Sequence, residues 1–166
     1  MWKVGHSLIK ARMHETHALL AGEMSGHIFF QDRFLGYDDA AYVGARIIEM
    51  MSDATSPYGD IALWLDTLPT TYSTPEIRVA CPDEAKKDVV TQALHAFADR
   101  YEVIDIDGVR INFAQGWGLI RPSNTQPVLV MRFEAQTGEL LIQYQAEVED
   151  WLRTYAPEVE WETNVH

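Results

Sequence analysis

Short apolar runs alternate with polar segments in the first third of the chain. Leu8, Ile9 and Met13 have the spacing of one helix face, which predicts a short helix near the N-terminus. The apolar runs 19–21 and 28–30 enclose a polar segment that has glycine near both ends. This stretch therefore predicts a strand, a tight loop and a second strand.

Apolar positions at three- and four-residue spacing then predict an amphipathic helix that ends near residue 51. These positions are Ala40, Val43, Ile47 and Met51. Asp38 precedes them and is predicted to be the N-cap, because its short side chain can accept hydrogen bonds from the first free amides of the helix. A weaker pattern predicts a second short helix over 61–65.

The segment 68–75 differs in composition from both of its neighbours. It contains two prolines and four serine or threonine residues, and such a stretch favours extended backbone. We therefore predict a linker at 71–75, which separates a first domain at 1–70 from a second domain at 76–166.

Beyond this linker the pattern predicts a compact α+β domain. Alternating residues predict a strand over 77–81, and the helix after it carries Asp83 and Glu84 in its first turn, where negative charge is favourable. Asp107-Gly108 lies between two alternating runs, which is the pattern of a hairpin. The remaining predicted elements are strands at 116–120 and 127–133 and a long helix at 141–155.

Charge and cysteine content narrow the functional classes. The 166 residues carry a net charge of −12, which argues against nucleic acid as a partner because phosphate backbones are bound by basic surfaces. One cysteine, Cys81, cannot form an intrachain disulfide, so we predict a reducing, cytoplasmic location. No apolar run of about 18 residues and no signal-peptide pattern occurs, so no membrane association is expected.

The polar loop between the first two predicted strands is a candidate binding site. It contains Glu23, Ser25 and His27. A carboxylate and a hydroxyl two residues apart suit two neighbouring sugar hydroxyls, because the carboxylate accepts two hydrogen bonds and the serine can donate or accept. The alternative is a capped turn, in which the same side chains satisfy loop amides without a ligand.

A second candidate site is the polar segment Arg121-Pro122-Ser123-Asn124-Thr125 between two apolar strands. The arginine offers a planar fork for phosphate oxygens, and Ser123, Asn124 and Thr125 add short donors. Successive amides of such a turn can also form an anion-binding nest. The alternative is a hairpin loop with an exposed arginine.

Histidines provide the other candidate chemistry. His6, four residues before Lys10, could transfer a proton or bind a phosphate. His14 and His17 have a spacing that could suit a metal, but no third ligand lies nearby in the sequence. The segment 105–108 resembles the start of a calcium loop without its downstream glutamate. We therefore expect no metal site.

The segments 22–27 and 121–125 together resemble the α-D-phosphohexomutase family, in particular its bacterial phosphomannomutase/phosphoglucomutase branch. Further segments resemble the family in the same order along the chain. They are 4–10, 34–40, 107–110, 116–118 and 129–135. Members of this family are four-domain isomerases, which transfer a phosphoryl group within a bisphosphorylated intermediate and so interconvert hexose 1-phosphate and 6-phosphate.

The resemblance implies roles for individual residues. In the third domain, Glu23 and Ser25 would contact sugar hydroxyls, with His27 and Lys10 in the same substrate-binding pocket. His6 would lie near the proton-transfer chemistry and is the candidate catalytic residue. The implied phosphate-binding loop of the fourth domain consists of Arg121, Ser123, Asn124 and Thr125, and would hold the phosphate that is not reacting.

The resemblance also implies what these residues lack. The family's phosphoserine loop, a Ser-His pair, and its magnesium loop, Asp-Gly-Asp-x-Asp, do not occur in the 166 residues. Mg²⁺ and a phosphorylated serine are therefore expected for the full-length enzyme, whereas this chain is expected to bind no cofactor and to be inactive alone. Its expected partners are a hexose phosphate, the missing domains 1 and 2, and a possible second copy in a homodimer.

The implied architecture is an α/β partial domain with a short mixed sheet and helices, followed by an α+β domain with an antiparallel four-stranded sheet and two helices. The first domain would lack its own N-terminal strand and helix, leaving a sheet edge or apolar surface uncovered. The chain is thus interpreted as the C-terminal part of a phosphohexomutase. A free-standing sugar-phosphate binding module and a domain pair that retains only its fold are the alternatives. Preference for glucose or mannose stays open.

Overall fold

The computed structural model describes residues 1–53 and 55–161. The chain forms two compact units, Met1–Pro69 and Thr70–His166. Ala54 and the last five residues of the predicted second domain lie outside the described residues. No helix of the described part is long and apolar enough to cross a membrane.

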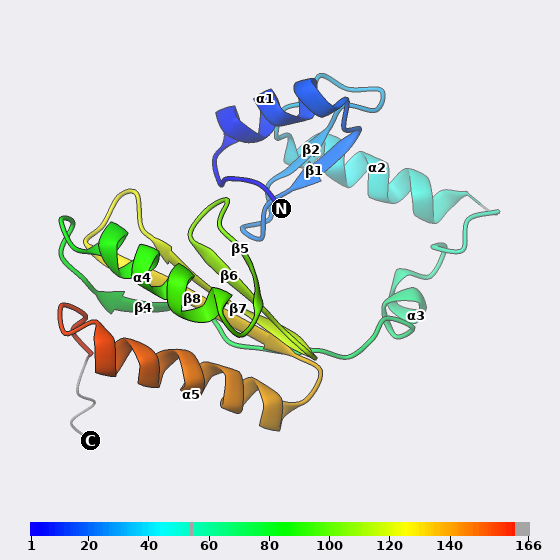
Figure 1. Cartoon of the computed structure of the whole chain (residues 1–166). Helices are drawn as coiled ribbons and strands as arrows, with labels where there is room; N and C mark the ends of the chain where they lie inside the picture. The colour runs from blue at the N-terminus through cyan, green and yellow to red at the C-terminus, as the bar shows by residue number, and fades with distance from the viewer. Residues whose placement is uncertain (54, 162–166) are drawn as a thin grey trace. The chain divides into compact units, whose positions relative to one another are not determined.

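The first unit has a small hairpin and three helices (Figure 1). Its elements are α1 (His6–Thr16), β1 (Leu20–Gly22), β2 (Ile28–Phe30), α2 (Ala40–Ser52) and α3 (Ile61–Leu65). The strands β1 and β2 pair antiparallel with Ala21 opposite Phe29. This sheet is antiparallel rather than mixed as predicted, because the short loop 23–27 joins its strands and a parallel pair needs a long crossover.

The core of this unit is small. Ile9 and Met13 from α1 pack with Phe29 from β2, and Ala18 and Ala21 cover them in part. Within the described residues β1 pairs with β2 alone, so its other edge is open. The helix α2 has no buried residue, and Ile48 on it is 65% exposed. The first unit thus has an unpaired strand edge and exposed apolar side chains on α2.

The start of α2 corrects the predicted cap. Asp39, not Asp38, is the N-cap, and its carboxylate accepts a hydrogen bond from the Tyr42 amide at 2.9 Å. Two adjacent aspartates cannot both take the cap position, because successive side chains point in different directions. Asp38 instead contacts His27, which makes it part of the candidate site described below.

The second unit is a six-stranded antiparallel sheet with two long helices. Its elements are β3 (Tyr72–Ser73), β4 (Ile77–Ala80), α4 (Lys86–Ala98), β5 (Glu102–Ile104), β6 (Val109–Phe113), β7 (Gly116–Pro122), β8 (Val128–Ala135) and α5 (Gly138–Tyr155). The strand order is β3-β8-β7-β6-β5, with β4 also paired to β8. The predicted α+β class, with two helices on an antiparallel sheet, is confirmed.

The sheet has six strands rather than the predicted four, and β3 is the strand that no sequence pattern indicated. Within the predicted linker 71–75, Tyr72 and Ser73 form β3, opposite Ala135 and Glu134 of β8. The Thr74 hydroxyl then accepts a hydrogen bond from the Phe133 amide at 3.1 Å. Backbone pairing thus holds this proline-flanked segment against the sheet, although its composition indicates only an extended conformation.

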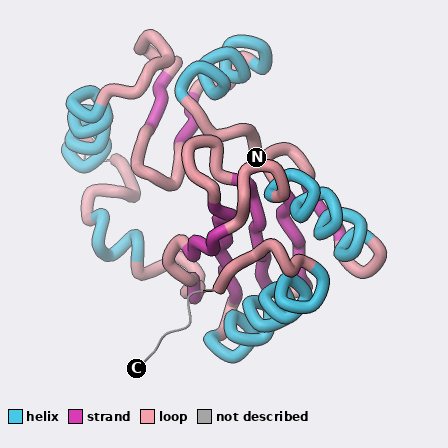
Figure 2. Tube along the Cα trace, turned by 90° about the vertical axis from the view of Figure 1, so that its left-hand side faces the viewer, coloured by secondary structure: helices cyan, strands magenta, loops and turns pink. Residues whose placement is uncertain are grey.

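Both helices cover one face of the sheet (Figures 1 and 2). Residues alternate along β6, where Val109, Ile111 and Phe113 are buried. The Phe113 ring stacks on Tyr144 of α5, with centroids 4.1 Å apart, and Phe97 of α4 lies 5.7 Å from the Trp151 ring of α5. The half-buried residues that alternate with these buried ones lie on the opposite face of the sheet, and Arg121 of β7 is one of them.

Candidate functional site

The hairpin loop, residues 23–27, is closed by its own backbone. The Glu23 amide donates to the His27 carbonyl at 2.8 Å, and the Gly26 amide donates to the Glu23 carbonyl at 3.0 Å. Gly26 has a φ of +91°, a conformation that side chains disfavour. The tight turn predicted from the sequence is therefore present, and it brings Glu23 and His27 to neighbouring positions at the ends of β1 and β2.

Glu23 also ties the hairpin to the start of α1. Its Oε1 accepts a hydrogen bond from the Gly5 amide at 2.9 Å, and its side chain is only 8% exposed. Gly5 is the N-cap of α1 and has a φ of +129°. A carboxylate in this place is favourable because the helix N-terminus carries partial positive charge. One oxygen of Glu23 thus satisfies an amide at the start of α1, rather than an amide of its own turn.

The second oxygen of Glu23 faces an imidazole. Its Oε2 lies 3.9 Å from His6 Nε2. His6 is the first residue of α1, and its ring contacts the His27 ring edge-on at a centroid distance of 4.7 Å and the Phe29 ring at 5.4 Å. The structure therefore brings together His6, Glu23 and His27, which we call the His–Glu cluster.

Asp38 orients His27. Its Oδ2 lies 2.5 Å from His27 Nδ1, and its Oδ1 accepts a hydrogen bond from the Ile28 amide at 3.3 Å. The hydrogen bond with His27 lowers the pKa of Asp38 below its usual value, which keeps the carboxylate ionised at neutral pH. Sequence reasoning missed this role because it assigned Asp38 to the helix cap. The sequence did contain one signal for this role. A helix needs only one N-cap, so the second aspartate of the pair Asp38-Asp39 was available for another contact.

Two predicted ligand-binding residues lie outside the cluster. Ser25 is exposed in the hairpin loop, and its hydroxyl makes no hydrogen bond with any residue that the structure describes. Lys10 is exposed on α1, one turn beyond His6, with its Nζ 6.0 Å from the centre of the Tyr37 ring. Both side chains are accessible to a ligand.

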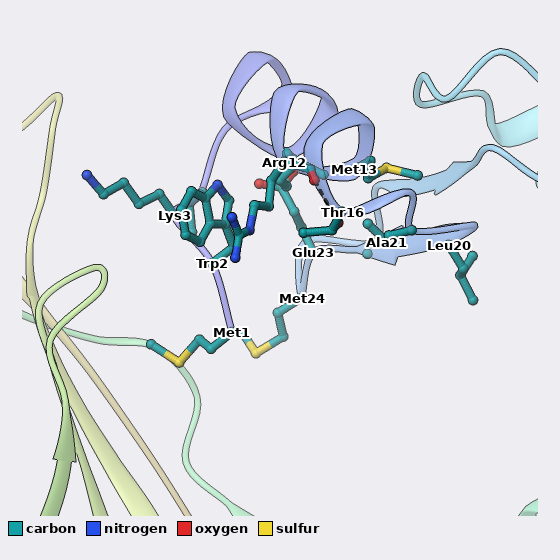
Figure 3. A pocket seen from close by; sticks show the side chains of 14 residues that line it. Met1, Trp2, Lys3, Arg12, Met13, Thr16, Leu20, Ala21, Glu23 and Met24 are labelled. Atoms are coloured by element: carbon teal, nitrogen blue, oxygen red, sulfur yellow. Dashed lines mark hydrogen bonds between the residues drawn. The ribbon is translucent and has the colours of Figure 1, made fainter.

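A pocket of about 600 Å³ lies in the same unit, between the N-terminal segment, α1 and β1 (Figure 3). Glu23 and Met24 form one side, and Trp2 and Arg12 form another. The guanidinium of Arg12 lies 4.3 Å from the centre of the Trp2 ring. The Thr16 hydroxyl donates to the Arg12 carbonyl at 2.7 Å. Glu23 thus lines this pocket and also contacts His6.

In the second unit, the loop between β7 and β8 (residues 123–127, the phosphate-loop candidate) is internally braced. Ser123 is 7% exposed. Its hydroxyl accepts hydrogen bonds from the Thr125 amide at 3.3 Å and the Gln126 amide at 3.2 Å. The Ser123 amide donates to the Val128 carbonyl at 3.0 Å. The Ser123 hydroxyl therefore shapes the turn, whereas Asn124 and Thr125 are exposed.

Lys86, the first residue of α4, supports this loop, and sequence reasoning missed it. Its Nζ donates to the carbonyls of Ser123 at 2.5 Å and Gln126 at 3.1 Å, and pairs with Asp83 at 2.5 Å. The residue is 8% exposed. A buried ammonium needs such partners. The only sequence signal was the i, i+3 pair with Asp83, because the loop lies 37 residues away.

Arg121 is half-buried and directly precedes Pro122, the last residue of β7. Its Nη2 lies 4.0 Å from Glu76 Oε2, a long ion pair. Gly108, at φ +85°, packs directly on this strand: a Cβ there would lie 2.6 Å from the Arg121 Cβ. The Asp-Gly turn predicted from the sequence thus permits the close approach of the backbone beside Arg121.

The donors present do not fit the Mg²⁺ that the family resemblance implies. Mg²⁺ prefers six oxygen ligands in octahedral geometry. The group of possible metal ligands within the described residues consists of two imidazoles and one carboxylate. The sequence contains no Asp-Gly-Asp-x-Asp segment. Within the described residues, this donor set is therefore unsuited to Mg²⁺.

Comparison with known proteins decides the family. Residues 1–67 match the family model "Phosphoglucomutase/phosphomannomutase, alpha/beta/alpha domain III", and residues 76–150 match the model of the C-terminal domain of the same family. The chain belongs to the phosphoglucomutase/phosphomannomutase family. The matches follow each other as domains III and IV.

Family members with known names cover nearly all of this chain. A phosphomannomutase/phosphoglucomutase of Pseudomonas syringae pv. tomato is 44% identical over 162 residues, which are 96% of this chain and 34% of that protein. The protein of that name from Pseudomonas aeruginosa PAO1 is 47% identical over 143 residues, covering 85% of this chain and 30% of its own length. This chain thus spans about a third of the length of these relatives.

A solved structure gives the same result for the fold. The X-ray structure of a phosphoglucomutase/phosphomannomutase family protein from Burkholderia thailandensis matches with a TM-score of 0.81 and 41% identity. The match covers 96% of this chain and 33% of that one. The predicted resemblance to the family and the predicted fold class are therefore confirmed.

Proposed function

We propose that this chain supplies hexose-phosphate recognition to a phosphohexomutase that interconverts hexose 1-phosphate and 6-phosphate. In this proposal Glu23 and Ser25 bind neighbouring sugar hydroxyls, and Arg121, Ser123, Asn124 and Thr125 bind the phosphate that is not reacting. The observation that carries this proposal is that the two carboxylate oxygens of Glu23 have different partners. One oxygen is used by the Gly5 amide and the other faces His6, so the carboxylate is fixed in position and still has acceptor capacity.

The braced phosphate-loop candidate supports the second half of the proposal. Lys86 and the Ser123 hydroxyl use the carbonyls and amides on the inner side of the turn. Asn124 and Thr125 stay exposed beside Arg121. A rigid turn that presents donors next to a guanidinium suits a phosphate, because little conformational freedom is lost on binding.

We assign proton transfer to His6, with His27 beside it. Phosphoryl transfer to a sugar hydroxyl requires that the hydroxyl lose its proton, and an imidazole suits this because its pKa lies near neutrality. Asp38 fixes the orientation of the His27 ring through Nδ1, which leaves Nε2 for a substrate hydroxyl. Lys10 would add positive charge on the same helix as His6.

The remaining parts of this proposal concern the whole enzyme. Mg²⁺ and a phosphorylated serine would belong to domains I and II, which would be the partners of this chain in a cytoplasmic enzyme. Contact with those domains, or with a second copy, would cover apolar side chains of α2 such as Ile48.

A titration of the 166-residue chain with glucose 1-phosphate and mannose 1-phosphate tests the proposal. We expect amide chemical shifts of Asn124 and Thr125 to move, and the movement to be lost in Arg121→Ala and weakened in Glu23→Gln, which keeps an acceptor for the Gly5 amide. Arg100→Ala and Glu15→Gln are the matched controls, since these exposed residues pair elsewhere. No shift up to about 10 mM, equivalent to only ~2.7 kcal/mol of binding, would reject useful phosphate recognition.

The second candidate is a free-standing sugar-phosphate binding module. It is favoured by the lack of both a Ser-His pair and an Asp-Gly-Asp-x-Asp segment in these residues. Either candidate predicts no mutase turnover by this chain alone, and measurable turnover would mean that the catalytic groups are misassigned. The intact mass of the native product distinguishes them: a product that carries the two missing loops rejects the module.

A further inference from the structure

We propose that the His–Glu cluster is a binding site for a borderline-soft divalent cation of the Zn²⁺ class. The cluster offers one ligand atom each from His6, Glu23 and His27, and these atoms all lie within 4.8 Å of one another. Two imidazoles and a carboxylate, with a fourth position open to solvent, are a ligand set that Zn²⁺ takes in proteins. The same set is poor for Mg²⁺ and Ca²⁺, which prefer oxygen ligands.

The side chains around the cluster already hold the ligands in the arrangement that such a metal needs. Asp38 binds Nδ1 of His27, and a carboxylate on the other ring nitrogen is the usual partner of a metal-binding histidine. Glu23 is fixed through Oε1 by the Gly5 amide, which leaves Oε2 toward His6. The His6 ring is flanked by Phe29 at 5.4 Å. Each ligand is therefore oriented by a group that does not itself bind the metal.

Only a small movement of the side chains would bring the three ligand atoms to the distances that a bound Zn²⁺ requires. Ligand atoms about 2.1 Å from a tetrahedral Zn²⁺ lie about 3.4 Å from each other. His6 Nε2 and Glu23 Oε2 are already 3.9 Å apart. The His6 side chain is 53% exposed, so it can turn toward the other two ligands and the ion can enter from solvent. A water molecule would fill the fourth position.

The cation would occupy Glu23 and both imidazoles, the groups proposed above to meet the sugar. Zn²⁺ would then compete with a hexose phosphate, and this consequence rests on the proposed function. The metal site itself does not, because Zn²⁺ binding is measured with the metal alone. Saturating Zn²⁺ that leaves hexose-phosphate affinity unchanged would count against the proposed role of Glu23 and leave the metal site standing.

Calorimetry of the full 166-residue chain with ZnCl₂, and visible absorption with Co²⁺, test the site. We expect one saturable ion per chain, with a tetrahedral Co²⁺ spectrum. Affinity should fall at least about 10-fold in His6→Ala and in His27→Ala, and about 10-fold in Asp38→Asn, which removes only the orienting charge. His14→Ala is the matched control on the same helix and should bind as the unsubstituted chain does. MgCl₂ should give no heat from the cluster.

A measurement on the unsubstituted chain covers the case in which a variant fails to fold. On addition of Zn²⁺ the imidazole nitrogen resonances of His6 and His27 should shift, while those of His14 and His95 should stay. Equal Zn²⁺ affinity in the chain and in a folded His6→Ala/His27→Ala variant would overturn the proposal. So would Zn²⁺-induced shifts confined to His14 and His17.

Discussion

Lys86 is a buried cation that reaches across 37 residues of sequence to hold a surface loop. Its ammonium donates to two carbonyls of the phosphate-loop candidate and pairs with Asp83. The Coulombic term with the exposed Asp83 is weak in water. The two charge-assisted hydrogen bonds to carbonyls matter more, because their loss removes the ammonium donor from the half-buried turn. The Gln126 carbonyl would keep the hydrogen bond that it accepts from the Val128 amide at 2.8 Å.

We therefore expect Lys86→Met to lower the free energy of unfolding of the second unit by about 2–3 kcal/mol. It should also broaden or shift the amide resonances of Asn124 and Thr125, since the turn loses its support. Urea denaturation and NMR spectra measure the two effects. Lys87→Met is the matched control, because Lys87 is exposed one residue further along. Equal effects of the two substitutions would show that Lys86 does not brace the loop.

Tyr101 couples the stability of the second unit to alkaline pH. Burial raises the pKa of its phenol, and the hydrogen bond to Glu147 raises it further. The folded chain therefore holds this proton more tightly than the unfolded chain. Its contribution to stability is fully present below the unfolded pKa of about 10 and is lost as pH rises through the higher folded pKa.

Tyr101→Phe should accordingly lower the free energy of unfolding at pH 7 by about 1 kcal/mol. It should also flatten the decline of stability above pH 10. Denaturation curves collected over pH 8 to 11 measure both effects, and Tyr155→Phe, at an exposed tyrosine of α5, is the control. If the stability of Tyr101→Phe fell as steeply above pH 10 as that of the unsubstituted chain, a group other than Tyr101 would cause the alkaline loss of stability.

Among the elements, the turn between β5 and β6 shows how a hairpin positions a neighbouring strand. A Cβ on Gly108 would lie 2.3 Å from the Ile120 carbonyl oxygen and 2.7 Å from the Arg121 Cα, and φ is +85°. An alanine would add backbone strain, typically 1–3 kcal/mol, to that overlap. The strand β7 would have to move just where it presents Arg121.

We expect Gly108→Ala to destabilise the second unit by at least about 2 kcal/mol and to weaken phosphate binding beyond its effect on folding. Gly44→Ala is a matched control, because Gly44 lies within α2 and no atom lies within 4 Å of a Cβ there. In a helix this change should be neutral or stabilising by about 1 kcal/mol. Thermal unfolding and phosphate titration at a temperature where both variants are folded measure the outcome.

The elements that sequence could predict are those defined by local rules. The helix α2, the hairpin turn at Asp107-Gly108 and the hairpin loop all follow from periodicity or turn chemistry, and the structure contains each of them. The pairing of Tyr72 and Ser73 with β8 did not follow, because an edge strand of two residues has no pattern of its own. Which of two adjacent aspartates caps a helix depends on geometry that a sequence does not display.

In the candidate site, too, some residues could be predicted from the sequence and others could not. Spacing marked Glu23, Ser25 and His27 as a candidate site, and the family resemblance placed His6 in the same pocket. In the structure, His6, Glu23 and His27 do lie together. The supporting residues could not be found: Asp38 acts across 11 positions and Lys86 across 37. Such contacts join residues that become neighbours only when the chain folds, so spacing carries no information about them.

At the scale of the whole molecule, the two units differ in how much apolar surface they bury. The first unit has a core cluster of Ile9, Met13 and Phe29, whereas the core of the second unit extends over two helices and the sheet. Stability rises with the apolar area removed from water. The apolar side chains of α2 and α3, including Ile48 and Leu63, remain exposed and add little.

The units should therefore open at different free energies. We expect amides of α1, β1 and α2 to exchange with deuterium well before those of β6, β7 and β8, and urea to unfold the first unit at a lower concentration. Phe29→Ala should hasten exchange in the first unit only, and Phe97→Ala in the second only, because each phenylalanine is fully buried in its own core. A single coincident transition, shifted equally by both substitutions, would mean that the chain unfolds as one cooperative unit.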